Sequence, residues 1–155
     1  MSKPGDASRL APHDPTSIPD DDRVLRRLSD DRPSMVYVDP LTNQRRPSSG
    51  SFAVKKDEDG LSVYREQVLS QNGLTAASVV TSPTNLVVAL EVHDIRSIRP
   101  LNVRDDPWPT DIPDTTHPRN AAHALITGWQ GLSRSERKER QNALVNAPSL
   151  RFVYP

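Results

Sequence analysis

The segment RRPSSGSFAVKKDEDGLSVYREQVLSQ, residues 45–71, carries turn, strand, loop and helix signals one after another without a gap. Pro47 to Gly50 form a turn-prone group, because Pro, Ser and Gly each favour turn conformations. The alternation of small and apolar side chains from Ser51 to Lys55 predicts a short strand after that turn. Residues 56–60, KDEDG, then supply a loop in which the chain changes direction.

A helix is predicted to follow this loop. Ser62 is placed to cap it, because a serine hydroxyl can accept a backbone N–H of the first turn. The apolar side chains that recur at helical spacing would form its buried face: Leu61, Tyr64 and Val68. The acidic residues of the loop lie beside the positive end of the helix dipole, where they stabilise the helix. Gly73 is expected to end the helix in a left-handed conformation.

The composition indicates one domain with a large share of loop. A chain of 155 residues is long enough for one domain with a core, but short for two. Only 34% of its residues are apolar and 15 are prolines, whereas an ordinary globular domain is about 45–50% apolar. We therefore expect part of the chain to be unfolded or irregular.

The charge and cysteine counts argue against several classes of protein. Lys plus Arg and Asp plus Glu are 20 each, so the chain lacks the basic surface of a general nucleic-acid binder or of a membrane-surface protein. The absence of cysteine removes disulfides and thiolate sites. No apolar run reaches the roughly 18–20 residues that a membrane span needs, and the N-terminus lacks the apolar core of a signal peptide. These features favour a cytoplasmic protein, and no glycine-rich loop predicts a bound cofactor.

Residues 1–33 are predicted to form a disordered, Pro-rich segment, because their small polar and acidic residues bury too little surface to offset the entropy of ordering. The run from Arg23 to Leu28, preceded by Asp20 to Asp22, predicts a short helix within it. The domain itself is then expected to span residues 34–155.

Besides Ser51 to Lys55, five segments have the character of strands. Ser34 to Asp39 and Gln44 to Phe52 are predicted to pair as an antiparallel hairpin. Leu86 to Val92 is the most apolar run of the chain and predicts a buried strand in the centre of a sheet. His123 to Gly128 and Leu150 to Tyr154 predict two further strands, the last of which would pair into the sheet.

The remaining segments complete the predicted fold. Leu74 to Thr81 fits a strand or a helix equally well, and His93 to Ile98 predicts a helical turn. A second helix should begin after Ser133, which forms a capping box with Glu136, and end before Pro148. The sequence therefore predicts a single small α+β domain, with a mainly antiparallel sheet of four to six strands and two principal helices.

Four pieces of the sequence together resemble a family of small bacterial proteins of uncharacterised function. They are Ser49-Gly50-Ser51-Phe52, the octet from Asp57 to Tyr64, the Val103 to Pro109 loop and the strand His123-Ala124-Leu125-Ile126. The family shares them in this order, and the resemblance spans roughly Met35 to Gly128. It implies a bacterial, soluble, stand-alone domain, and it supplies no catalytic residues.

Few residues are candidates for metal binding or nucleophilic catalysis. The chain has four histidines: His13, His93, His117 and His123. None has the His-x-x-x-His or Glu-x-x-His spacing of a helical metal site, so no metal site is predicted. The turn serines Ser48, Ser49 and Ser51 lack a Gly-x-Ser-x-Gly elbow, so we interpret them as turn residues.

A phosphate or nucleotide site is one functional hypothesis. The residues that would form it carry guanidinium forks and hydroxyl donors, which suit a pyrophosphate group. They are Arg45, Arg46, Ser48 and Ser49, with Tyr64 and Arg65 across from them. With a later glutamate, Glu66 or Glu91, they give the outline of a mono-ADP-ribosyltransferase-like site. The alternative is that Arg45 and Arg46 are solvated and balance nearby acids.

Binding to another protein is the second hypothesis. The passage from Arg104 to Arg119 is a long Pro-rich loop, and such loops are often functional or disordered. Within it, Trp108 lies between two prolines, so it is preorganised to anchor a partner protein, or alternatively to cover one face of the sheet. We expect a non-enzymatic accessory or interaction module, with a nucleotide-binding enzyme that uses Arg45 to Arg65 as the alternative. Whether the chain is an enzyme stays open.

Overall fold

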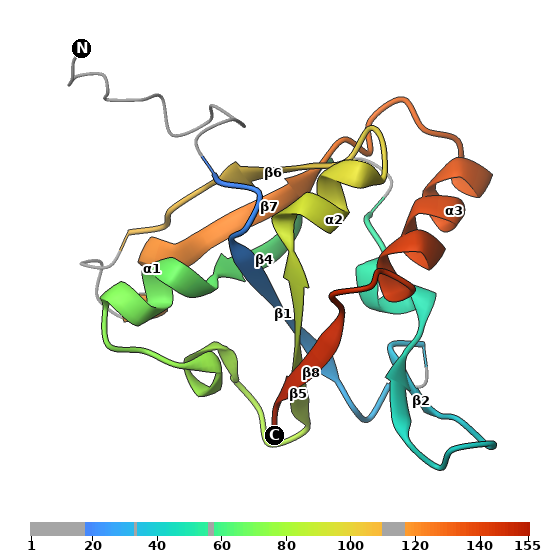
Figure 1. Cartoon of the computed structure of the whole chain (residues 1–155), viewed down its shortest axis with the longest axis horizontal. Helices are drawn as coiled ribbons and strands as arrows, with labels where there is room; N and C mark the ends of the chain where they lie inside the picture. The colour runs from blue at the N-terminus through green and yellow to red at the C-terminus, as the bar shows by residue number, and fades with distance from the viewer. Residues whose placement is uncertain (1–17, 33, 56–57, 110–116) are drawn as a thin grey trace.

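The computed structural model describes residues 18–32, 34–55, 58–109 and 117–155. A six-stranded antiparallel sheet, in the order β6-β7-β4-β1-β5-β8, is joined by a two-stranded sheet, β2-β3, that projects at one end (Figure 1). The strands are β1 (Arg23–Ser29), β2 (Val36–Val38), β3 (Arg45–Pro47), β4 (Leu61–Arg65), β5 (Asn85–Glu91), β6 (Asn102–Asp105), β7 (His123–Thr127) and β8 (Arg151–Tyr154). The helices are α1 (Glu66–Gln71), α2 (Val92–Ser97) and α3 (Arg134–Val145). The predicted α+β class is confirmed.

The first strand corrects a prediction. Residues 23–28 were expected to form a short helix, but Arg23–Ser29 is an interior strand that pairs with β4 on one side and with β5 on the other. Val24 and Leu28 pack on one face of the sheet, and Leu25 packs on the opposite face. Pairing on both sides overrides the helix propensity of the leucines and arginines. The prediction that residues 1–33 are disordered and that the domain begins at residue 34 is therefore wrong for the part that the structure describes, because Arg23–Ser29 lies within the sheet and Ile18 is buried in the core. Residues 1–17 lie outside the described part of the chain.

The segment predicted as a helix from Ser62 is partly strand. Leu61 and Val63 are buried while Ser62 between them is exposed, which is the two-residue period of β4. Only Glu66–Gln71 is helical, and its N-cap residue is Arg65, so Ser62 does not cap it. Gly73 has φ of 72° just after α1, which confirms the predicted left-handed end.

The strand predicted from Ser51 to Lys55 is also wrong. Residues Ser49–Phe52 form a 3₁₀ turn that turns Phe52 into the core, where its side chain is fully buried. Two hydrogen bonds hold the turn at Ser51. Arg26 Nε donates to the Ser51 carbonyl over 2.7 Å, and the Ser51 hydroxyl donates to the carbonyl of Met35. The hairpin predicted upstream is present but short, with Val36 opposite Pro47 and Val38 opposite Arg45.

Several predicted elements are confirmed. Asn85–Glu91 is a buried interior strand, followed by the helical turn α2, and the C-terminal strand β8 pairs with β5. The capping box of α3 is complete, because the Ser133 hydroxyl accepts the N–H of Glu136 while the Glu136 carboxylate accepts the N–H of Ser133. The ambiguous segment from Leu74 to Thr81 contains a 3₁₀ turn, Ala76–Val79.

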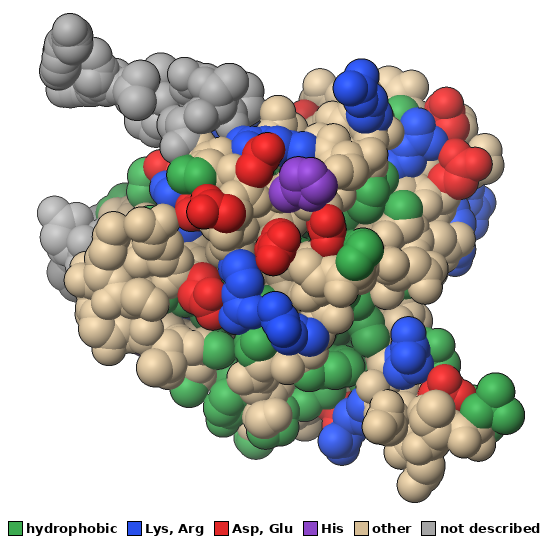
Figure 2. Space-filling view, viewed as in Figure 1, with side chains coloured by type: hydrophobic (Ala, Val, Ile, Leu, Met, Phe, Trp, Pro, Cys, Tyr) green, Lys and Arg blue, Asp and Glu red, His purple; other side chains and the backbone are tan. Residues whose placement is uncertain are grey.

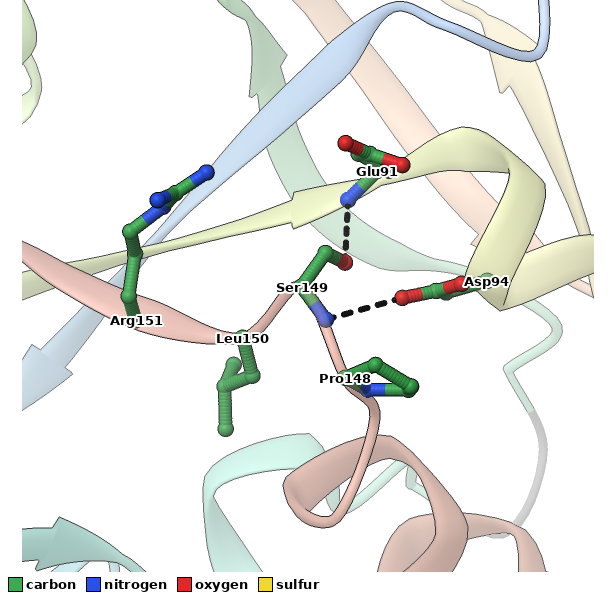
Figure 3. Close-up of a pocket in the computed structure, with 6 residues that line it drawn as sticks. All are labelled: Glu91, Asp94, Pro148, Ser149, Leu150 and Arg151. Carbon is green, nitrogen blue, oxygen red and sulfur yellow. Dashed lines mark hydrogen bonds between the residues drawn. The ribbon is translucent and has the colours of Figure 1, made fainter.

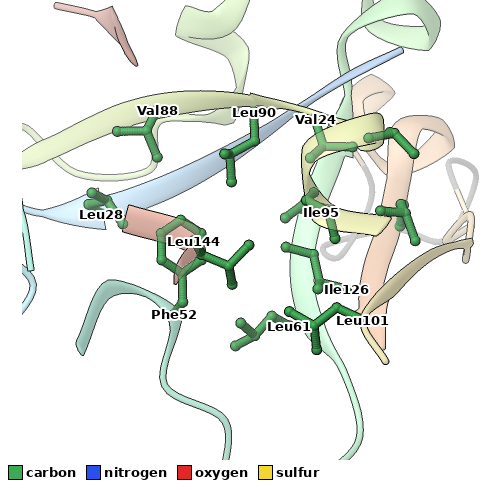
Figure 4. Packing of buried hydrophobic residues seen from close by; sticks show 14 of the residues in the cluster. Val24, Leu28, Phe52, Leu61, Val88, Leu90, Ile95, Leu101, Ile126 and Leu144 are labelled. Carbon is green, nitrogen blue, oxygen red and sulfur yellow. The ribbon is translucent and has the colours of Figure 1, made fainter. Parts of the chain in front are cut away.

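The sheet has a hydrophobic cluster on each face. The larger cluster packs α2, α3 and the Ser49–Phe52 turn against one face through residues that include Phe52, Ile95, Trp129 and Leu144 (Figure 4). The smaller cluster packs α1 and the Ala76–Val79 turn against the other face through Leu25, Tyr64, Leu69 and Val79. The chain thus buries both faces of its sheet, and two edge strands, β6 and β8, remain at its ends.

The Pro-rich passage from Arg104 to Arg119 begins as part of edge strand β6. Beyond it, Trp108 N–H donates to the carbonyl of Asn120, and the Asn120 amide donates to the carbonyl of Pro109, each over 2.8 Å. Residues 110–116 lie outside the described part of the chain. Within the described ranges, the structure contains no helix that could span a membrane.

Candidate ligand- and partner-binding site

An open groove of about 290 Å³ lies between the hairpin strand β3, the end of α3 and the edge strand β8. Three of its lining residues are arginines, Arg45 and Arg46 from β3 and Arg151 from β8. Apolar side chains line the rest of it: Val88, Val145, Ala147, Leu150 and Phe152. We call this site the arginine groove; it combines positive charge with an apolar floor.

The charge of the arginine groove is only partly neutralised. Arg45 pairs with Asp30 over 3.0 Å between guanidinium nitrogen and carboxylate oxygen. Neither Arg46 nor Arg151 has an ion-pair partner among the described residues. Because a guanidinium presents a planar fork of N–H donors, these two side chains are free to bind carboxylate or phosphate oxygens.

The hairpin beside the groove carries an exposed apolar surface. Among the described residues, three of the four exposed large hydrophobic side chains lie on it: Tyr37 is 44% exposed, Val38 55% and Leu41 93%. Its turn is held by the Asp39 carboxylate, which accepts the N–H of Leu41, and by Asn43 in the left-handed conformation with φ of 58°. The hairpin stands off from the body of the molecule (Figures 1 and 2), so its side chains are accessible.

A second open pocket, of about 330 Å³, adjoins the arginine groove and shares Leu150 and Arg151 with it (Figure 3). Its acidic side is formed by Glu91 and Asp94, and Ser149 connects the two. The Ser149 hydroxyl accepts the N–H of Glu91 over 2.9 Å, and its own N–H donates to the Asp94 carboxylate over 3.0 Å. Hydrogen bonding from Ser149 lowers the pKa of Asp94, so this side stays negative. Arg151 therefore stands between a basic groove and an acidic pocket.

The structure divides the residues of the predicted nucleotide site. Arg45 and Arg46 line the arginine groove, but Ser48 and Ser49 are not among its lining residues, and the Ser48 hydroxyl donates to the carbonyl of Ser34. Arg65 is only 15% exposed and pairs with Asp22 over 2.8 Å. The candidate glutamates are separated as well, because Glu66 pairs with Arg23 over 2.7 Å and Glu91 lines the acidic pocket.

Trp108, the predicted partner anchor, is 45% exposed. Its ring stacks on His123, with ring centroids 3.7 Å apart and planes 23° from parallel. The tryptophan thus covers one face of a buried histidine while part of its own surface stays accessible. In the described ranges, no three His, Asp or Glu side chains form a group that could hold a metal ion.

Arg151 and the apolar floor were not found from the sequence. The alternation in the C-terminal strand could have indicated that Arg151 is exposed, because it precedes Phe152, which packs against the larger cluster. What the sequence does not show is that β8 lines the same groove as β3, which is more than 100 residues upstream. Comparisons with family models, with curated proteins and with solved structures found no match. The function therefore has to be inferred from the residues themselves.

Proposed function

We propose that this protein is a protein-interaction module that binds an extended, acidic segment of a partner protein in the arginine groove. The observation that carries the proposal is that Arg46 and Arg151, which form no ion pair with any described residue, lie beside an apolar floor and next to a hairpin of exposed apolar side chains. Such a surface favours a ligand in which carboxylates alternate with apolar side chains.

Three features favour an extended peptide as the occupant. Arginine binds carboxylates through paired N–H donors, so each free guanidinium can take one acidic side chain. Edge strand β8 has no strand paired along its outer side among the described residues, which leaves backbone groups for a bound chain. Tyr37, Val38 and Leu41 add aromatic and aliphatic contact area beside the groove.

The setting that we propose is the bacterial cytoplasm, where the module acts as an accessory to its partner. The cysteine-free composition is compatible with this location, and the resemblance to small bacterial proteins supports the bacterial origin. Trp108 lies elsewhere, on edge strand β6's side of the sheet, so the groove and hairpin replace it as the main binding surface in this proposal.

Fluorescence anisotropy of the full chain tests the proposal. The probe is a short labelled peptide in which glutamate alternates with valine, and its control carries lysine in place of glutamate. Arg46→Glu and Arg151→Glu should each weaken binding about tenfold or more, because each removes a charge-assisted contact and adds repulsion. Arg134→Glu is the matched control, since Arg134 is exposed and lies outside the groove.

Two results would count against the proposal. Equal binding of the acidic and basic peptides would show that the arginines do not select the ligand. Saturable binding of NAD or ATP that is lost in Arg46→Glu, without binding of the acidic peptide, would instead support the nucleotide-binding enzyme that uses the Arg45 to Arg65 region. That alternative shares Arg45 and Arg46 with the groove, so the same variants serve both tests.

A further inference from the structure

Ser62, His123 and Asp106 meet on the side of the sheet where Tyr64 packs. Ser62 belongs to β4, His123 begins β7 and Asp106 directly follows β6. Tyr64 lies opposite His123 in the antiparallel ladder, so these two side chains share a face of the sheet. Ser62 is two residues before Tyr64 on β4, so its side chain lies on the same face. Ser62 Oγ is 3.0 Å from Nε2 of His123. The other ring nitrogen, Nδ1, is 2.9 Å from the backbone carbonyl of Asp106 and 3.2 Å from its carboxylate oxygen Oδ2.

These contacts determine which ring nitrogen carries the proton. A carbonyl and a carboxylate can only accept hydrogen bonds, so Nδ1 must be the donor. Nε2 of the neutral ring then has its lone pair directed at the Ser62 hydroxyl. Burial lowers the pKa of His123, which keeps the ring neutral near pH 7. A neutral histidine in this tautomer is the form that a general base requires.

The imidazole is held in a fixed orientation. Trp108 stacks on it at 3.7 Å, and Tyr64 contacts it edge-on at 5.5 Å between ring centroids. His123 is fully buried, whereas Ser62 is exposed. The base is therefore shielded from water while the hydroxyl that it contacts faces solvent. Asp106 and Tyr64 are the titratable residues that contact the ring among those described.

We propose that Ser62 is a nucleophile activated by His123, with Asp106 as the residue that positions the base, and that its substrates are small activated esters. This goes beyond the proposed interaction function and does not rest on the arginine groove, which lies beside β8 at the opposite end of the strand order from β6 and β7. The arrangement has the roles of a Ser-His-Asp triad on a strand, without a nucleophile elbow.

The chemistry balances with water as the co-reactant. Ser62 Oγ attacks the ester carbonyl carbon while its proton moves to Nε2 of His123. The bond to the leaving group breaks, and the leaving alcohol takes that proton. A water molecule then attacks the acyl-serine and gives a proton to Nε2, and Ser62 recovers a proton as the carboxylic acid leaves. The imidazolium formed at each step is stabilised by the Asp106 carboxylate and by the face of Trp108.

The test uses the full chain, a fluorophosphonate probe and 4-nitrophenyl acetate. Peptide mass spectrometry should find the phosphonyl group on Ser62, at least about tenfold faster than on Ser70, an exposed serine of α1. Ser62→Ala should abolish ester hydrolysis beyond the background rate, and Ser70→Ala should leave it unchanged. The labelling rate should rise with pH as His123 loses its proton, and Asp106→Asn should move the midpoint to lower pH, because the carboxylate raises the pKa of His123.

Two results would overturn the proposal. If Ser62 in the unaltered chain is labelled no faster than Ser70, its hydroxyl serves only to satisfy the buried histidine. If the labelling rate of Ser62 does not follow a single ionisation below neutral pH, His123 is not its base. Both measurements use the unaltered chain, so a variant that fails to fold does not affect them.

Discussion

Asp59→Ala is expected to destabilise the protein, because one carboxylate oxygen holds the turn that follows β7. Asp59 Oδ1 accepts the backbone N–H of Trp129 over 2.7 Å and that of Gln130 over 2.9 Å. The Trp129 side chain is fully buried, and its indole N–H donates to the carbonyl of Ile126 over 2.9 Å. The aspartate therefore connects the loop before β4 to a turn that anchors the largest side chain of the core.

The size of the effect follows from the two bonds. A hydrogen bond to a charged group contributes about 1.5–3 kcal/mol, and its loss leaves the partly buried Trp129 N–H without an acceptor. The bond to Gln130 is exposed, so water replaces it and its loss adds little. We expect Asp59→Ala to lower the free energy of unfolding by about 2–3 kcal/mol, or roughly 5–10 °C in Tm for a chain of this size.

Urea denaturation of the full chain, followed by tryptophan fluorescence, measures this change. Asp59→Asn keeps an oxygen acceptor and should cost less than half as much as Asp59→Ala. Glu58→Ala, at an exposed neighbouring carboxylate, should stay within about 0.5 kcal/mol of the unaltered chain. A pure charge effect, such as attraction to a helix dipole, predicts instead that Asp59→Asn and Asp59→Ala cost the same. That equality, or a loss below about 0.5 kcal/mol for Asp59→Ala, would refute the hydrogen-bonding role.

Three further predictions concern stability. Burial holds the folded-state pKa of His123 below its unfolded value, so the unfolded chain binds more protons. Stability that is present above about pH 6.5 should therefore fall as the pH drops, by at most about 1.4 kcal/mol per unit. Denaturation at several pH values should show a flatter curve for His123→Gln than for the control His93→Gln, which changes an exposed histidine. Ser133→Ala should lower the free energy of unfolding by about 1 kcal/mol through loss of the α3 cap, and an unchanged urea midpoint would contradict this. Gly128→Ala should lower the free energy of unfolding by about 2 kcal/mol or more, because φ is 103° and the new Cβ would lie 2.4 Å from the carbonyl oxygen of Pro100. Gly73→Ala, with φ of 72° and open space around the new Cβ, should lower it by only about 1 kcal/mol. Equal melting temperatures of the two variants would show that the close approach at Gly128 is unimportant.

The sequence predicted best those elements whose signals are local. The α3 capping box depends on Ser133 and Glu136, three residues apart, and the left-handed end of α1 depends on Gly73 alone. The apolar run of β5 was sufficient to identify a buried strand. In the first two cases, neighbours along the chain supply the decisive contacts. In the third, the run is apolar on both faces, so it predicts a buried strand although its partners β1 and β8 are distant in the sequence.

The wrong predictions involve elements that distant contacts stabilise. Residues 23–28 have a helix-compatible composition, but their pairing with β4 and β5 makes them a strand. Ser62 had the chemistry of an N-cap, yet its hydroxyl contacts His123, 61 residues away. For the same reason, the sequence predicted only part of the arginine groove. Arg45 and Arg46 were identified together, but Arg151 joins them through the position of β8 in the sheet.

An NMR titration of the full chain with the glutamate-valine peptide tests the proposed function most directly. The account predicts shifts in the backbone amides of β3 and β8 and in the side-chain Nε–H signals of Arg46 and Arg151, the groove arginines without an ion-pair partner among the described residues. Signals around the acidic pocket at Glu91 and Asp94 should move little. Shifts confined to that pocket or to the surroundings of Trp108, or no shifts at all at saturating peptide, would contradict an acidic partner segment in the arginine groove.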